Sequence, residues 1–229
     1  MMYAQNYIIL SEKEWNSNLV ENLKIEFPRD KWIHINHEEE FNFQVLSELK
    51  PKKIFIPHWS HIIPKEIFEN FECIVFHMTD LPYGRGGSPL QNLIVRGHKD
   101  TMISALKVVE EIDAGPIYLK SELSLEGNAQ EIFNRCNDII QKMISQIVKE
   151  NPIPSAQVGE IIHFKRRKRE DGDIGNLDSL ESVYDYIRML DAEGYPKAFL
   201  ELDHFTVEFS DVKYENNKAL KANVRIIKK

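Results

Sequence analysis

The sequence has few cysteines and no long apolar segment, and both absences exclude classes of protein. It contains only two cysteines, Cys73 and Cys136, far apart and each among apolar residues. Such usage favours reduced core residues in a cytoplasmic protein over a disulfide framework. No apolar run reaches the roughly 18 residues that a membrane-spanning helix needs, so no membrane partner is expected. The apolar run at residues 7–10 has no cationic lead, and we expect no signal peptide.

Several motifs of nucleotide binding and nucleophilic catalysis are also missing. The chain contains no GxGxxG, no P-loop and no GxSxG, so nicotinamide, ATP and α/β-hydrolase chemistry have no support. Two His-x-x-His pairs occur, His34 with His37 and His58 with His61. No cluster of cysteines or carboxylates completes either of them as a zinc site, and we therefore expect no metal.

Length and charge set further bounds. The 229 residues suffice for one good-sized domain and a small second one, and 42% hydrophobic with 28% charged residues is ordinary for a globular protein. The formal net charge is -7. A protein that binds tRNA is expected to offer a broad basic surface, because phosphates dominate the affinity for nucleic acid. The charge therefore argues against a nucleic-acid partner, although a local basic patch is compatible with it.

The pattern of apolar residues predicts an α/β fold. Short buried strands are expected at residues 7–10, 32–35, 54–56 and 73–76, with helices around residues 15–23, 38–49 and 65–70 between them. Strands that alternate with helices favour a doubly wound, mostly parallel, Rossmann-like sheet. Ligands of such sheets bind outside the carboxyl ends of the strands, and His77 follows the fourth strand at that position.

The remainder of the chain predicts a second, smaller domain. A helix is expected to open at Ser88 and Pro89, strands at residues 101–108 and 116–123, and a long helix at residues 128–150. Residues 164–173 form a charged stretch that reads as a linker, followed by a helix at residues 179–192 and strands at residues 205–209 and 222–227. We place the boundary near Arg169, which gives a catalytic domain of residues 1–169 and a small C-terminal α+β extension of residues 170–229.

One segment carries a recognisable catalytic pattern. Residues 77–91 read HMTDLPYGRGGSPLQ, and Asp113 follows in an Asp-Ala-Gly turn. This combination resembles the folate-dependent formyltransferases, in which a histidine precedes a Leu-Pro-x-x-Arg-Gly run. The resemblance implies that His77 and Asp113 are catalytic. An imidazole can exchange the protons of the amine and of the leaving nitrogen or hold an oxyanion when charged, and a carboxylate orients its ring. The family's asparagine, two residues before the histidine, is replaced by Val75.

The same resemblance implies 10-formyltetrahydrofolate as the cosubstrate and no metal. Its pterin is expected against backbone groups of two segments, comprising His61, Ile62 and Ile63, and Val109, Glu110, Glu111, Ile112 and Asp113. Substrate contacts are expected from Arg85, Gly86, Arg166 and Arg167. Alternatives remain for these four. A conformational role for Gly86 and a structural ion pair for Arg85 are favoured over substrate contact, and the basic run of residues 165–169 is more often a solvated linker than a contact for phosphates.

The C-terminal region indicates which class of acceptor to expect. Residues 194–199, GYPKAF, resemble the start of the C-terminal region of methionyl-tRNA and sugar formyltransferases, and only residues 200–229 follow. A short, non-basic C-terminal region and the acidic charge of the chain favour a small acceptor, the amine of an amino-deoxy nucleotide sugar in bacterial surface-sugar (pseudaminic acid-like) pathways, with no nucleic-acid partner and with homodimerisation left open. The alternatives are a formyltransferase acting on aminoacyl-tRNA or another amine, and a catalytically inactive folate-binding protein, which Val75 would permit.

Overall fold

The computed structural model describes residues 4–13, 16–216 and 218–229. Its contacts divide the chain into two compact units, neither of them continuous in sequence. The first comprises Met1–Arg85, Met102–Leu123 and Asn134–His163, and the second comprises Gly86–Thr101, Ser124–Phe133 and Phe164–Lys229. The predicted single boundary at residue 169 stays a prediction. Trp15, expected in the first helix, lies outside the described residues.

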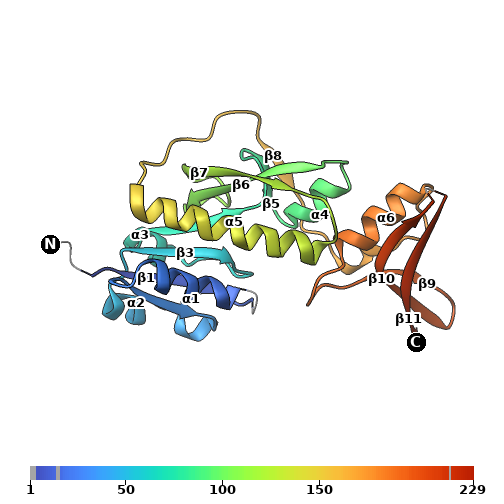
Figure 1. Ribbon diagram of the computed structural model, residues 1–229, viewed down its shortest axis with the longest axis horizontal. Helices are drawn as coiled ribbons and strands as arrows, with labels where there is room; N and C mark the ends of the chain where they lie inside the picture. The colour runs from blue at the N-terminus through green and yellow to red at the C-terminus, as the bar shows by residue number, and fades with distance from the viewer. Residues whose placement is uncertain (1–3, 14–15, 217) are drawn as a thin grey trace. The chain divides into compact units, whose positions relative to one another are not determined.

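The first unit is built on a six-stranded mixed sheet in the order β2-β1-β3-β4-β6-β7 (Figure 1). β1 pairs in parallel with β2 and β3, β3 pairs in parallel with β4, and β4 pairs antiparallel with β6. This arrangement confirms the predicted Rossmann-like α/β class and the predicted strands. The strands are β1 (Asn6–Ser11), β2 (Lys31–Ile35), β3 (Lys53–His58), β4 (Cys73–His77), β6 (Asp100–Lys107) and β7 (Ile117–Ser124).

Helices cover both faces of this sheet, which explains why its central strands are continuous apolar runs. On one face, Ile8 and Ile54 form a core with Leu46 of α2 (Phe43–Leu49) and Ile67 of α3 (Lys65–Asn70). Residues alternate between the two faces of a strand, so Ile9 and its neighbours are buried on the other one. Two further helices, α1 (Ser17–Glu26) and α5 (Ala129–Glu150), are joined through the hydrogen bond from Lys149 Nζ to Glu26 Oε1 (2.6 Å).

Two predicted segments differ from the structure. The helix expected at residues 38–49 is interrupted: η2 (Glu38–Glu40) is a short 3₁₀ turn, and α2 begins only at Phe43. Asn42 stands at the N-cap of α2, where its side chain accepts a hydrogen bond from the Val45 N–H (3.0 Å). An asparagine that satisfies a free N–H in this way favours a helix start over a helix interior.

The stretch of residues 164–173 is not a plain linker. It begins in β8 (Ile162–Phe164), which forms a two-stranded sheet with β5 (Tyr83–Gly86), and continues through η3 (Arg169–Gly172). Both strands are short, and β5 contains two glycines and an arginine, so neither carries the apolar alternation that predicts a strand.

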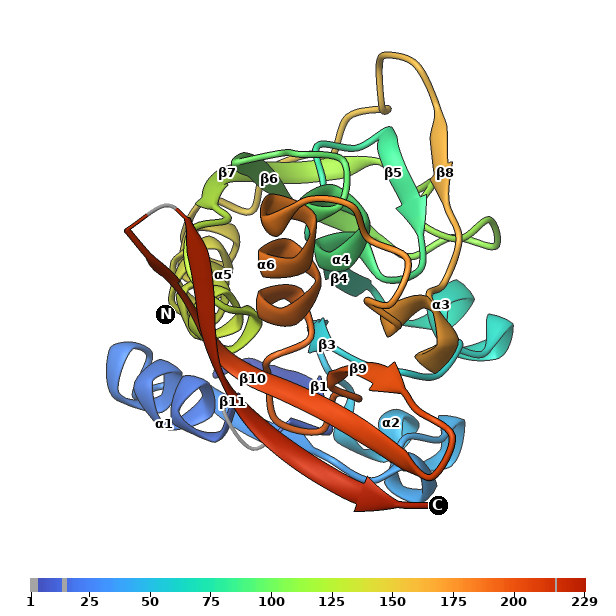
Figure 2. The same ribbon diagram turned by 90° about the vertical axis from the view of Figure 1, so that its right-hand side faces the viewer.

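The second unit contains α4 (Pro89–Ile94), α6 (Leu180–Met189) and a three-stranded antiparallel sheet in the order β11-β10-β9 (Figure 2). The strands are β9 (Ala198–Glu201), β10 (Phe205–Glu215) and β11 (Ala219–Lys228). Buried hydrogen bonds tie earlier segments to α6: Arg188 Nη1 donates to the carbonyl of Leu125 (2.7 Å), and Gln91 Nε2 donates to that of Met189 (3.1 Å). Among the described residues, no helix is long and apolar enough to cross a membrane.

Candidate functional site

His77 is the last residue of β4 and is 7% exposed. Its Nε2 donates a hydrogen bond to the carbonyl of Gly84 (2.8 Å), and its Nδ1 lies 3.6 Å from Oδ1 of Asp113. Because a carbonyl oxygen can only accept, Nε2 must carry a proton. The distance to Asp113 exceeds that of a hydrogen bond but suits an ion pair with a protonated ring. Two acceptors therefore flank the imidazole.

The turn that carries Asp113 is fixed at two points. Asp113 has φ 55°, in the left-handed region that aspartate tolerates better than most residues. A Cβ at Gly115 would lie 1.7 Å from the carbonyl oxygen of Lys107, so only glycine fits there. In addition, Gln157 Nε2 donates to the carbonyl oxygens of Asp113 (2.7 Å) and Gly115 (2.9 Å).

Sequence reasoning did not find Gln157. It lies in the segment between α5 and β8, without periodicity or a motif, and its partner Asp113 is 44 residues away in sequence. Only the fold brings the two together, and no local signal in the sequence could have identified the contact.

Arg85 is buried and fully engaged by protein groups. Its Nη1 pairs with Oε1 of Glu111 (2.8 Å), and its Nε and Nη2 donate to Oε1 of Gln157 (3.1 and 2.9 Å). These bonds agree with a structural ion pair, one of the two roles considered for this residue. A contact between Arg85 and a substrate stays a prediction.

The chain after His77 is held by a second set of hydrogen bonds. Ser104 Oγ donates to the carbonyl of Thr79 (2.8 Å) and accepts from the N–H of Leu81 (3.4 Å). Lys120 Nζ donates to the carbonyl of Leu81 (2.6 Å) and pairs with Asp80 (2.5 Å). The peptide bond between Leu81 and Pro82 is cis. A cavity of about 330 Å³ borders this turn, lined by Leu81, Ile117, Tyr118, Leu119, Lys120, Ser155, Ala156, Gln157 and Val158.

Val75 occupies the position of the family's asparagine. It lies within β4, opposite Ile56 on one side and Leu106 on the other, and packs against the hydrophobic core. Its side chain offers no hydrogen-bond donor for an oxyanion. The N–H of Leu81, in the turn after His77, bonds to Ser104 Oγ (3.4 Å), and which group stands in for the asparagine stays open.

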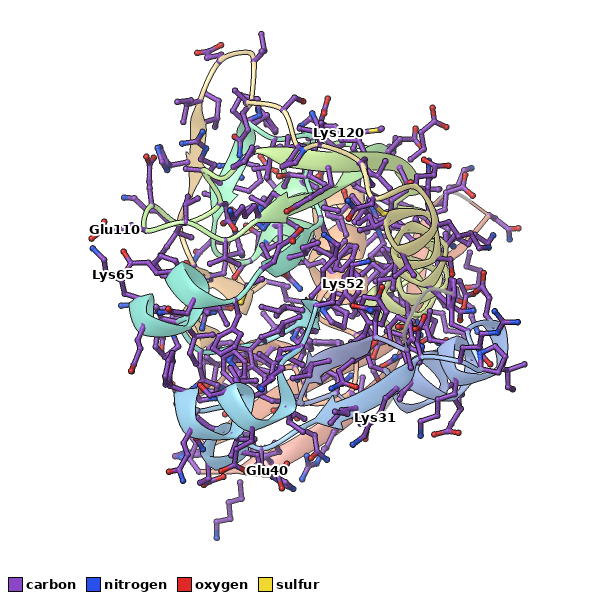
Figure 3. The ribbon with its side chains drawn as sticks, turned by 90° about the vertical axis from the view of Figure 1, so that its left-hand side faces the viewer. Lys31, Glu40, Lys52, Lys65, Glu110 and Lys120 are labelled. Carbon is purple, nitrogen blue, oxygen red and sulfur yellow. The ribbon has the colours of Figure 1, made fainter. Side chains whose placement is uncertain are left out.

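The two segments expected to hold folate are neighbours. His61, Ile62 and Ile63 lie between β3 and α3, and Lys65 at the start of α3 pairs with Glu110 of the second segment (3.3 Å) (Figure 3). Their side chains Ile62 and Ile112 are 81% and 61% exposed. Exposed apolar side chains on neighbouring loops suit a planar ring that would cover them.

His61 itself is engaged by carboxylates. Its Nε2 lies 2.7 Å from Oε1 of Glu12, and its Nδ1 lies 3.4 Å from Oε2 of Glu38. Within the described ranges, no group of three or more histidine, cysteine, aspartate or glutamate side chains is arranged to hold a metal ion.

The other predicted substrate residues belong to the second unit. Gly86 has φ 108°, and a Cβ there would lie 2.4 Å from the carbonyl oxygen of Phe164, which agrees with the conformational role. The side chain of Arg166 is exposed. Arg167 donates its N–H to Ser88 Oγ (3.0 Å), and its guanidinium lies 5.2 Å from the ring centre of Tyr186.

Part of the basic run contacts aromatic rings. Besides the contacts of Arg167, the guanidinium of Arg169 lies 4.6 Å from the ring centre of Phe199. Two of the guanidinium groups thus make cation–π contacts, while Lys165, Arg166, Lys168 and Arg169 are exposed, and the interpretation of this run as a solvated linker stays a prediction. Contacts between Arg166 or Arg167 and a substrate stay a prediction.

Comparison with known proteins agrees with the geometry of the site. Residues 20–148 match the family model described as formyl transferase, and residues 169–227 match that of the methionyl-tRNA formyltransferase C-terminal domain. The chain belongs to the formyl transferase family. The expectation of a formyltransferase is thereby confirmed at the level of the family, and the fold around His77 and Asp113 is a formyltransferase fold.

Among relatives of this formyltransferase chain is the solved structure of a methionyl-tRNA formyltransferase from Clostridium thermocellum. It is 48% identical, the match covers 98% of this chain and 100% of that one, and the TM-score is 0.95. The methionyl-tRNA formyltransferase of Campylobacter lari is 34% identical over 72% of this chain and 54% of its own length. The chain spans about half the length of the curated relatives it matches, 49% and 54% in two of them.

The expected substrate was wrong. A nucleotide-sugar acceptor without a nucleic-acid partner was inferred from the short C-terminal region and the acidic charge. The Clostridium thermocellum methionyl-tRNA formyltransferase matches this chain over its whole length, so a short C-terminal region does not distinguish the two acceptors. A solved sugar N-formyltransferase from a Shewanella species is only 17% identical, with a TM-score of 0.67, and shares the fold alone.

Proposed function

We propose that this chain transfers a formyl group from 10-formyltetrahydrofolate to the amino group of methionyl-tRNA. The observation that carries the acceptor is the 48% identity to a methionyl-tRNA formyltransferase over nearly the entire chain. The observation that carries the chemistry is the approach of Asp113 to His77, 3.6 Å apart at the end of β4. Both predicted catalytic residues are thus neighbours in space, as formyl transfer by this pair requires.

The reaction sets a definite task for the protein. The folate supplies the formyl carbon, a new C–N bond forms to the amine, and the bond to the folate nitrogen breaks. The attacking amine loses one proton and the leaving nitrogen gains one, so a group that can both take and give a proton serves the two halves of the reaction. An imidazole does this near neutral pH, and His77 is the buried histidine at the end of β4.

The surroundings of His77 fit this role. The Gly84 carbonyl accepts a hydrogen bond from Nε2 and so orients the ring, which leaves Nδ1, 3.6 Å from Asp113 Oδ1, as the nitrogen that can exchange a proton. When doubly protonated, the ring also carries a positive charge that can oppose a developing oxyanion, which Val75 cannot do. The exposed Ile62 and Ile112 on neighbouring loops would hold the folate ring.

The net charge of -7 is compatible with a tRNA partner. Affinity for nucleic acid depends on cations at the contact surface rather than on the total charge of the protein. Lys165, Arg166, Lys168 and Arg169 are exposed next to one another in the second unit. This basic cluster is the part of the surface that we expect to contact phosphates.

The proposal is tested by incubating the purified protein with 10-formyltetrahydrofolate carrying a labelled formyl group and with methionyl-tRNA. We expect label in the aminoacyl ester and formylmethionine after its hydrolysis. Uncharged tRNA should take up none, because it lacks the amine. Absence of formylmethionyl-tRNA, with folate bound and released unchanged, would contradict the proposal and favour the inactive folate-binding alternative.

A further inference from the structure

The amide of Gln157 has an unambiguous orientation. Arg85 presents Nε and Nη2 to it at 3.1 and 2.9 Å, and a guanidinium can only donate hydrogen bonds. The amide oxygen must therefore face Arg85. The amide nitrogen then faces the carbonyl oxygens of Asp113 and Gly115, which can only accept. Arg85 is itself held by Glu111, and this restrained guanidinium determines the orientation of the Gln157 amide.

The two carbonyls that Gln157 binds enclose Ala114, the centre of the catalytic turn. Asp113 is held there with φ 55°, a conformation that a free turn would adopt only a small part of the time. The turn also abuts the backbone of Lys107, which leaves no room for a Cβ at Gly115. The two hydrogen bonds of Gln157 are a further restraint on the backbone of the turn.

The position of this turn matters because the contact with His77 is loose. Asp113 Oδ1 lies 3.6 Å from Nδ1, too far for a hydrogen bond that would hold the carboxylate in place. The backbone position of Asp113 therefore contributes to the alignment of the pair.

We infer that Gln157, oriented by Arg85, is the positioning residue that keeps Asp113 aligned with His77. It acts through Asp113 and has no need to touch the reacting atoms. The inference rests on the proposed function of the His77 and Asp113 pair.

The substitution Gln157→Glu separates this role from a general need for packing. Glutamate has nearly the same shape and keeps acceptors toward Arg85, but it replaces the donor to the two carbonyls with an oxygen that repels them. The matched control is Gln146→Glu, which makes the same chemical change on the exposed surface of α5, where the amide bonds to the exposed Glu150. Two readouts are needed: steady-state formylation of methionyl-tRNA, and the ¹⁵N chemical shifts of the His77 ring without substrates.

We expect Gln157→Glu to lower kcat about 10- to 100-fold, the effect of a misplacement on the order of 1 Å, with the KM for methionyl-tRNA within about threefold of wild type. The ring nitrogens of His77 should shift in this variant, whereas Gln146→Glu should match wild type in both readouts. If Gln157→Glu does not fold, Gln157→Met keeps the length of the side chain, removes the donor, and should give the same pattern.

A kcat within about twofold of wild type together with unchanged His77 shifts would overturn the inference. A rise in KM with kcat unchanged would also overturn it, because the residue would then act in substrate binding. Failure of the proposed function is distinguishable: wild type would not formylate methionyl-tRNA, while the shifts of the His77 ring would still report whether Gln157 positions Asp113.

Discussion

A single added methyl group at Gly115 should displace the catalytic turn. A Cβ there would lie 1.7 Å from the carbonyl oxygen of Lys107, and Cβ contacts under 3.0 Å do not occur, so the backbone must move by at least 3.0 − 1.7 = 1.3 Å. Lys107 is fixed in β6 by its register with Ile74 and by the hydrogen bond from its N–H to the carbonyl of Pro116 (2.9 Å). The turn, rather than the strand, must therefore give way.

The expected cost of Gly115→Ala follows from this displacement. Asp113 lies two residues before the clash, and a misplacement of about 1 Å near a catalytic group can lower the rate about 100-fold. We predict a fall in kcat of that order, with a smaller change in KM. The crowding should also lower the free energy of unfolding by about 1–3 kcal/mol, the usual cost of overpacking.

The assay compares kcat for methionyl-tRNA formylation and the thermal midpoint of Gly115→Ala with those of wild type. The control is Gly97→Ala, where φ is +78° but no atom lies within 4 Å of the added Cβ. In that variant the free energy of unfolding should fall only by the strain of a left-handed alanine, about 1–2 kcal/mol, and kcat should be unchanged. A Gly115→Ala protein with kcat within about threefold of wild type would refute the reasoning that the turn is pinned against β6.

Two further predictions concern Val75 and the thiols. Val75→Asn should change kcat by less than about tenfold, because the oxyanion already has another donor; a rise of about 100-fold or more would mean that no substitute donor exists. Burial raises the pKa of the Cys73 and Cys136 thiols to about 12, so both stay protonated at pH 8. We expect a thiol reagent to label neither in the native protein and both after unfolding; rapid native labelling would contradict the buried placement.

The strands that position the site were predictable because their buried residues form short apolar runs that are visible in the local sequence. β1, β3 and β4 are short apolar runs between helical segments, and that alternation correctly predicted both the α/β class and the place of His77 at a strand end. The resemblance of the following turn to a family motif then added Asp113. The structure confirms that the two residues are neighbours, while their catalytic roles stay predictions.

What could not be predicted depends on contacts between distant parts of the chain. β5 and β8 are strands only because they pair with each other, and Gln157 reaches Asp113 only through the fold. From the sequence alone, Arg167 is one of a run of cations expected to be solvated. In the structure its guanidinium lies 5.2 Å from the ring centre of Tyr186. The substrate was misjudged for a different reason. The acceptor was inferred from the length of the C-terminal region and from the net charge, although neither describes a local binding surface.

The most direct test of the account is the single-turnover rate of formyl transfer to methionyl-tRNA in wild type and in His77→Ala. The matched control is His204→Ala, which removes an exposed histidine of the second unit. With protein in excess over both substrates, the rate reports chemistry rather than product release. We predict a loss of about 10²- to 10⁴-fold for His77→Ala, the range for lost acid–base catalysis, and an unchanged rate for the control. If His77→Ala keeps more than about half of the wild-type rate, proton transfer takes place elsewhere and the assignment of this centre is wrong.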